Sequence, residues 1–249
     1  MKYLITLICL AIATIGWGQD QDNFDKATTL YQKGDYSQAA AVYSSILKSG
    51  KESSALYYNL GNTYYKLNNV PESIYYYEKA LQLDPENADA KNNLIFANQM
   101  KVDAITPLPK TWVRQLSDGI VGLFSAHTWA VLSIIGVFAF VLSFLLYYFV
   151  ERTALKRTFF SLMLVFLFFA IGSYTLAHFC HKQVSQTQYA ILFDKTVRVF
   201  SDANAYSSEI MQLHEGTKVE IIEDAKDWVK IRLVNGKTGW TKVSGLKKL

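Results

Sequence analysis

The segment most informative about the architecture is Tyr57–Pro85, which reads YYNLGNTYYKLNNVPESIYYYEKALQLDP. Five of its positions repeat at one fixed offset, 34 residues closer to the N-terminus. Small residues match small ones and bulky residues match bulky ones, which predicts antiparallel helices in close contact. The matched pairs are Ala27 with Gly61, Leu30 with Tyr64, Tyr31 with Tyr65, Ala39 with Ser73, and Tyr43 with Tyr77.

The second copy resembles a tetratricopeptide repeat, although Ser73 stands where that family usually has alanine. The first copy is weaker, because Phe24 is slightly out of place, but Gly34-Asp35-Tyr36 marks its inter-helix turn. Residues 88–101 continue the register as a capping helix. The resemblance therefore predicts an all-α segment over residues 20–101, with two repeats and a cap. Its signature residues are Tyr57, Leu60, Gly61, Tyr64, Ser73, Tyr77, Ala80 and Pro85.

The resemblance also implies a binding surface on the first helix of each repeat. The side-chain amides of Asn59 and Asn62 are suited to hold the backbone of an extended peptide. A second interpretation stays open, in which these residues are solvated or pack against a neighbouring domain. The predicted groove residues are Phe24, Thr28, Tyr31, Tyr58, Asn59, Asn62 and Tyr65.

Two long apolar runs account for much of the 51% hydrophobic content. Residues 128–149 and 159–180 are each long enough to cross a bilayer, which needs about 20 apolar residues. Between them, residues 150–158 carry Arg152, Lys156 and Arg157. Positive loops stay in the cytoplasm, so we expect a transmembrane hairpin whose two outer ends are exported.

The first 18 residues have the pattern of an export signal. Lys2 precedes a short apolar core, and Gly16 and Gly18 supply small residues for cleavage. An uncleaved anchor is the alternative. Cys9 is a poor lipid acceptor, because Ile8 precedes it where such sites have a small residue. The signal and the basic loop agree on one topology, with both soluble parts exported; in a bacterium this is the periplasmic side of the inner membrane.

Residues 110–125 place apolar side chains at three- and four-residue spacing, beginning at Trp112, with Arg114 on the other side. This pattern predicts an interfacial amphipathic helix, or alternatively a soluble linker helix. At the outer end of the second span, His178, Cys180 and His181 point in different directions on a helix, so we expect no metal site.

From about residue 188 the hydrophobic pattern changes to period two, which predicts short strands curled into a small barrel. Asn235-Gly236 predicts a hairpin turn. Residues 188–249 resemble a bacterial SH3-like domain, on Leu213, Glu215-Gly216, Asp227-Trp228-Val229 and Gly239-Trp240. Trp228 and Trp240 either form an aromatic shelf for a ligand or, in the interpretation we favour, pack as structural residues of the barrel.

The order of these segments closely resembles the BatE-like family of the aerotolerance operon of Bacteroidota. The resemblance implies a multidomain membrane protein that works beside membrane proteins with von Willebrand type A domains and, indirectly, a MoxR-type ATPase. We expect a non-enzymatic scaffold in contact with the lipid bilayer, with no cofactor. A net charge of +4 gives no reason to expect nucleic acid. The alternative is an envelope sensor whose barrel binds peptidoglycan or a cell-wall peptide.

Overall fold

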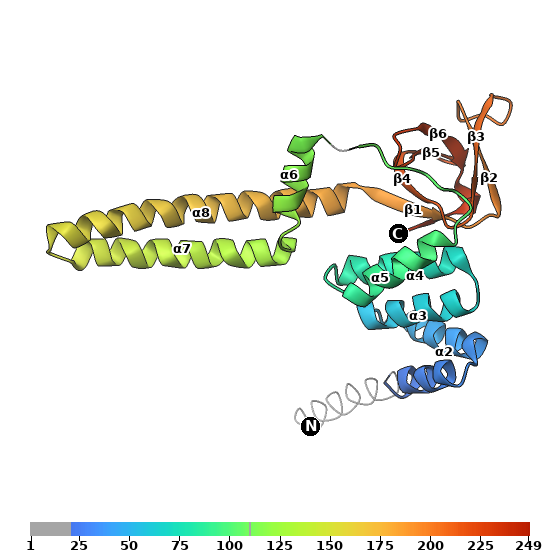
Figure 1. Cartoon of the computed structure of the whole chain (residues 1–249), viewed down its shortest axis with the longest axis horizontal. Coiled ribbons are helices and arrows are strands. Elements are labelled where there is room, and N and C mark those ends of the chain that lie inside the picture. The colour runs from blue at the N-terminus through green and yellow to red at the C-terminus, as the bar shows by residue number, and fades with distance from the viewer. Residues whose placement is uncertain (1–20, 110) are drawn as a thin grey trace, which may run out of the picture. The chain divides into compact units, whose positions relative to one another are not determined.

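The computed structural model describes residues 21–109 and 111–249, which form two compact units (Figure 1). The first unit joins residues 21–107 to residues 188–249, and the second spans Leu108–Thr187. The predicted signal over residues 1–18, with Cys9, lies outside the described residues.

The N-terminal part of the first unit is entirely helical. Residues 21–32 are helical and are followed by α2 (Tyr36–Lys48), α3 (Ser54–Lys66), α4 (Val70–Leu83) and α5 (Ala88–Gln99). Side-chain oxygens of Ser53, Asn69 and Asn87 cap the N-termini of α3, α4 and α5. Gly34 and Asn68, one repeat apart, both have positive φ (85° and 56°), and glycine and asparagine are the residues that tolerate this conformation. The repeat thus extends from side-chain size to backbone geometry.

Helices α3 and α4 are in close contact. A β-carbon on Gly61 would come within 2.5 Å of Cδ1 of Tyr77, so only glycine fits there. The hydroxyl of the buried Ser73 donates to the Gly61 carbonyl at 3.0 Å. The serine that departs from the family pattern therefore adds a hydrogen bond between the two helices.

The C-terminal part of the first unit is an antiparallel barrel of seven strands in the order β3-β2-β6-β5-β4-β1-β7. Alternate residues point inward, among them Val197, Val199, Val229 and Ile231, which are at most 6% exposed. Gly236, with φ of 81°, turns the chain between β5 and β6. The strands are β1 (Gln188–Leu192), β2 (Thr196–Phe200), β3 (Glu209–His214), β4 (Lys218–Ala225), β5 (Trp228–Arg232), β6 (Thr238–Lys242) and β7 (Leu246–Lys248), with a 3-10 turn (Val243–Gly245) before β7.

The helices and the barrel share a packed interface. Ile191 of β1 is fully buried within the core of the helical repeats, and Phe193 meets the Tyr75 ring edge to face at 6.0 Å. The ammonium group of Lys247 lies 4.0 Å from the Tyr75 ring centroid and 3.3 Å from a carboxylate oxygen of Glu72. Two segments more than 80 residues apart in the sequence therefore form one compact unit, although their sequence patterns indicate two separate modules.

A carboxylate lies at the edge of this interface. Asp103, in the loop after α5, accepts hydrogen bonds from the His214 backbone N–H (2.6 Å), the His214 ring (2.8 Å) and the Thr217 hydroxyl (2.7 Å). Burial alone would raise the pKa of Asp103, but these hydrogen bonds outweigh burial and hold the pKa below its ordinary value. The carboxylate thus fastens the β3–β4 turn to the helical part of the unit.

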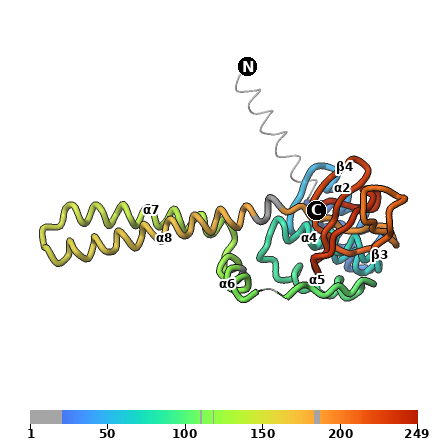
Figure 2. The backbone as a smooth tube through the Cα atoms, turned by 90° about the horizontal axis from the view of Figure 1, so that it is seen from above, coloured from blue at the N-terminus to red at the C-terminus, as the bar shows by residue number. Residues whose placement is uncertain are grey.

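The second unit contains α6 (Trp112–Val121), α7 (Ala126–Phe149) and α8 (Thr153–Gln186). Figures 1 and 2 both show α7 and α8 side by side as a long antiparallel hairpin. Gly136 lets the helices approach, because a β-carbon there would come 3.1 Å from that of Ala170. The Ser133 hydroxyl donates to the Ala170 carbonyl at 3.0 Å.

Both hairpin helices are long and apolar enough to cross a membrane, over Ala126–Phe149 and Thr153–Lys182. The connection between them is shorter than the nine-residue loop expected from the sequence. Helix α8 begins at Thr153, so Lys156 and Arg157 are already helical. The basic segment contains no glycine or proline that would stop the helix, so the helix extends through it.

Candidate functional site

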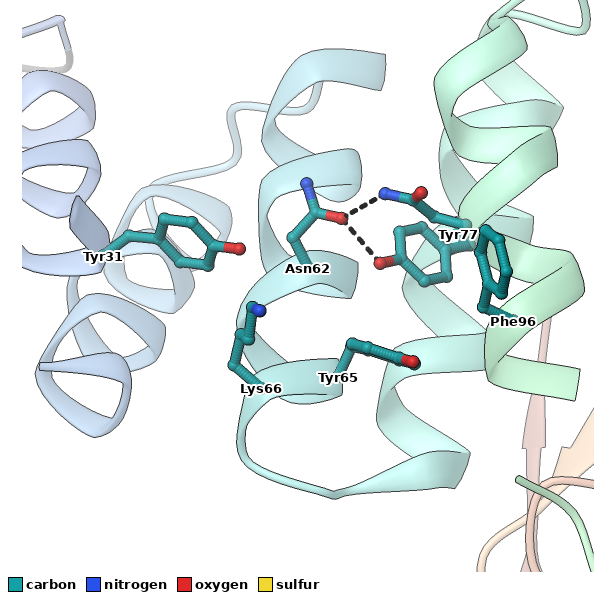
Figure 3. Close-up of a pocket in the computed structure, with 7 residues that line it drawn as sticks. Tyr31, Asn62, Tyr65, Lys66, Tyr77 and Phe96 are labelled. Atoms are coloured by element: carbon teal, nitrogen blue, oxygen red, sulfur yellow. Dashed lines mark hydrogen bonds between the residues drawn. The ribbon is translucent and has the colours of Figure 1, made fainter. Parts of the chain in front are cut away.

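The inner side of the repeats is hollowed by a cavity of about 190 Å³. Figure 3 shows its lining side chains converging from the helix over residues 21–32, from α3 and α4, and from α5. Small residues such as Gly61 bring these helices close enough for the side chains to meet. The lining residues are Tyr31, Asn62, Tyr65, Lys66, Tyr77, Asn93 and Phe96.

Asn62 is the centre of the hydrogen bonding in this cavity. Its side-chain oxygen accepts from the Tyr77 hydroxyl at 2.6 Å and from the Asn93 amide at 2.7 Å, as the dashed lines of Figure 3 show. The same Asn93 amide nitrogen lies 3.3 Å from the Tyr58 hydroxyl. Three helices are tied together at one amide oxygen, so the orientation of the Asn62 side chain is fixed.

The phenols around Asn62 are held in their protonated form. Burial is the main cause that raises the pKa of Tyr77, against smaller opposing effects of the nearby Asn93 and Ser73 side chains. Burial also raises the pKa of Tyr31, with neighbouring tyrosines adding to the effect. The Tyr77 hydroxyl therefore remains a donor to Asn62 over the whole physiological pH range.

Several polar groups of the cavity are left for a ligand. Among the described residues, the Asn62 amide nitrogen, the Tyr65 hydroxyl and the Lys66 ammonium group have no hydrogen-bond partner. None of the lining side chains is acidic, and Lys66 adds a positive charge. The cavity is thus rich in donors, and it is suited to carbonyl or carboxylate oxygens.

The structure brings together three of the seven predicted groove residues, Tyr31, Asn62 and Tyr65. Phe24 lines a separate hollow near the start of α3 and packs against Tyr43. The remaining three lie outside the cavity lining. Thr28 is hydrogen-bonded to the Tyr43 hydroxyl at 2.9 Å, Tyr58 accepts from Asn93, and Asn59 lines neither hollow.

Four lining residues were missed by the sequence analysis: Lys66, Tyr77, Asn93 and Phe96. The 34-residue offset contains a signal for two of them, because it relates Asn59 to Asn93 and Asn62 to Phe96. Residues 88–101 continue the register in the sequence, but the predicted groove residues include none of them. The capping helix α5 instead supplies one wall of the cavity.

The barrel presents a second surface, on the outer face of its sheet. Val229 and Ile231 point into the barrel core, so Trp228 and Lys230 point outward. Trp240 lies opposite Lys230 on the neighbouring strand, with the ammonium group 5.7 Å from its ring centroid. Phe200 meets Trp228 edge to face at 5.6 Å. The two tryptophans are therefore half-exposed outer residues, and the buried barrel core is built from other residues.

Comparisons with known families agree with this architecture. Residues 24–88 match the tetratricopeptide repeat family, and residues 195–247 match the bacterial SH3 domain family. The chain contains both kinds of domain. Both are typically non-catalytic interaction domains, and tetratricopeptide repeats indicate protein partners. No curated protein matches the chain.

Proposed function

We propose that this protein is a membrane-anchored scaffold whose helical cavity holds an extended segment of a partner protein. The observation that carries the proposal is the fixed amide of Asn62, whose nitrogen is left without a protein partner among the described residues. A backbone carbonyl of a bound segment would accept from it, and Lys66 would attract a nearby carboxylate. The groove is short, so a second contact through the barrel would strengthen the attachment.

The proposed setting is the periplasmic side of a bacterial inner membrane. The packing of Ile191 against the repeats supports this topology, because the chain enters and leaves the second unit from one compact unit. Two crossings by α7 and α8 leave both ends of that unit on the same side of the bilayer. Export of both ends follows if Arg152, Lys156 and Arg157 stay in the cytoplasm.

The resemblance to the BatE-like family suggests which proteins are held. The partners would be membrane proteins with von Willebrand type A domains and, indirectly, a MoxR-type ATPase, in an aerotolerance-type envelope complex. Within such a complex the role of this chain is to raise the local concentration of its partners, with no chemistry of its own.

Photo-crosslinking in intact cells tests the scaffold proposal. A photoreactive phenylalanine analogue at Tyr65, inside the cavity, is expected to capture an envelope protein, whereas the same analogue at Ala41, on the exposed side of α2, is not. Lys66→Glu should reduce the Tyr65 crosslink at least about tenfold, the loss of one charge-assisted contact. Lys48→Glu makes the same charge change outside the cavity and should leave the crosslink intact. Equal capture from both positions, or equal effects of both variants, would refute the proposal.

The topology has a separate test. Alkaline phosphatase, which is active only after export, is fused after Leu249 in one protein and after Glu151 in another. We expect activity from the first fusion and none from the second. An inactive Leu249 fusion in a protein that is expressed and inserted would contradict the periplasmic assignment.

The outward position of Trp228 and Trp240 favours one second candidate, an envelope sensor whose barrel binds peptidoglycan. Half-exposed aromatic rings beside Lys230 are suited to a ligand with flat apolar faces and negative charge. Cosedimentation of the full-length protein with purified cell wall tests this function. Trp240→Ala should abolish sedimentation, and Tyr206→Ala, in an exposed loop, should not. No sedimentation of the wild-type protein excludes the sensor and leaves the scaffold unaffected.

A further inference from the structure

Helix α6 carries an apolar stripe that no described part of the protein covers. Trp112, Leu116 and Ile120 are 75%, 59% and 41% exposed, and they recur at the four-residue spacing that keeps side chains on one side of a helix. Beyond the end of the helix, Leu123 and Phe124 are also exposed. A stripe of this size indicates an apolar partner outside the protein.

The end of α6 is fixed directly to the beginning of the apolar hairpin. The indole N–H of Trp129, in the first turn of α7, donates to the Val121 carbonyl at 3.3 Å. The rings of Phe124 and Trp129 meet edge to face at 5.1 Å, and Trp129 is only 8% exposed. Ser125 caps α7, so only four residues separate the end of α6 from the helix that is apolar enough to span a membrane. The stripe is thus held at the level where a spanning helix enters the bilayer.

The direction of α6 differs from that of the hairpin. Figures 1 and 2 both show α6 running across the long axis of α7 and α8, at the end of the hairpin where α7 begins. If α7 and α8 cross the bilayer, a helix that runs across them at their end lies along the membrane surface.

We propose that α6 is a membrane-surface helix, with the side chains of Trp112, Leu116 and Ile120 inserted among the lipids at the boundary between headgroups and acyl chains. Tryptophan is enriched at this boundary, where its apolar ring and its N–H both find partners. Within Trp112–Val121 the charged residues are Arg114 and Asp118, so the helix has no net charge. Binding is therefore driven by apolar burial, and it requires no anionic lipid.

This site is independent of the proposed peptide groove, because no groove residue belongs to the second unit. Its consequence is mechanical. A helix in the membrane plane fixes the rotation of the hairpin about its own axis and the height at which the chain leaves the bilayer towards the first unit.

An environment-sensitive fluorophore on the full-length protein tests the proposal. The protein, with Cys9 and Cys180 replaced by serine, carries Leu116→Cys or, as the matched control, Ser117→Cys, one residue away and about 100° further round the helix. Each is labelled and reconstituted in phosphatidylcholine nanodiscs. Leu116→Cys should show blue-shifted emission and several-fold stronger quenching by lipids with a spin label near the headgroup than Ser117→Cys. Iodide in the buffer should quench the Ser117→Cys label more strongly than the Leu116→Cys label. Salt at about 1 M, where charge interactions are screened, should change neither the lipid quenching nor the iodide quenching.

Three results would overturn the proposal. In the first, iodide quenches both labels equally, which means that the helix is in water. In the second, the Leu116→Cys label is shielded from iodide but is not quenched by labelled lipid, which means that a protein surface covers the stripe. In the third, lipid quenching appears only when anionic lipid is added. A label at Ile134→Cys, on the exposed side of α7, confirms insertion of the hairpin in every sample.

Discussion

Replacing Asp103 by asparagine preserves the size of the side chain and removes the negative charge that fastens the barrel to the helices. The carboxylate accepts three hydrogen bonds between 2.6 and 2.8 Å, and its side chain is only 11% exposed. Hydrogen bonds to a charged group contribute about 1.5–3 kcal/mol each, and an amide keeps only part of this set. Because the partner His214 is about one-third exposed, solvent reduces the loss. We expect Asp103→Asn to lower the free energy of opening the interface by about 2–3 kcal/mol.

Hydrogen exchange followed by mass spectrometry measures this loss in the full-length protein in detergent. Residues 188–193 report on the interface, because β1 packs against the helical core. Their exchange should be about 30- to 150-fold faster in Asp103→Asn, since every 1.4 kcal/mol is a tenfold change. Asp202→Asn, in an exposed loop, is the matched control and should change the free energy by less than about 0.5 kcal/mol. Equal exchange in the two variants would refute the stabilising role of Asp103.

The pH dependence of the same contact follows from the lowered pKa of Asp103. A carboxyl whose pKa is lower in the folded state stabilises the fold above its unfolded pKa, about 3.9 for aspartate, and this stabilisation is lost as pH falls through the folded pKa. In urea unfolding, the gap between wild type and Asp103→Asn should therefore be widest at neutral pH and should narrow below about pH 4. A gap that stays constant into strong acid would show that the effect is not due to ionisation.

Two further substitutions test the packing, each by urea unfolding of the full-length protein. Gly61→Ala places a β-carbon within 2.5 Å of the Tyr77 ring and should cost about 1–3 kcal/mol, whereas Gly119→Ala, with no neighbouring atom within 4 Å, should be neutral or slightly stabilising. If Gly61→Ala and Gly119→Ala change the free energy of unfolding equally, the close contact between α3 and α4 is not rigid. Lys247→Gln removes the positive charge beside Glu72 and the aromatic rings, and it should lower the free energy of unfolding by about 1 kcal/mol. High salt should reduce this difference. A variant as stable as wild type would show that this partly exposed lysine is not stabilising.

The elements of this protein could be predicted from the sequence because each is governed by local pattern. The 34-residue repeat of small and bulky residues specifies the paired helices, and the family match over residues 24–88 confirms the type of repeat. Alternation of period two specifies the strands, and the match over residues 195–247 confirms the type of barrel. The two uncharged runs specify helices long enough to cross a membrane. In each case residues close together in the sequence specify the type of element.

The composition of the cavity could be predicted only in part. Tyr31 and Tyr65 carry the repeat, so their common position was accessible from the sequence. The joint contact of Tyr77 and Asn93 with one oxygen of Asn62 was not, because it depends on the register in which three helices pack. The hydrogen bond between the Thr28 hydroxyl and Tyr43 of the neighbouring helix depends on helix packing in the same way.

Local sequence pattern specifies most of the helices, the strands and the apolar spans, since periodicity and hydropathy act over a few residues. The packing of the barrel onto the helical repeats, through contacts such as Asp103 with His214, is visible only in the folded protein. Those residues are 111 positions apart, and no local pattern relates them. Their meeting depends on complementary surfaces that exist only after both parts have folded, because a long-range contact stabilises the chain only once the entropy of closing the intervening segment has been overcome.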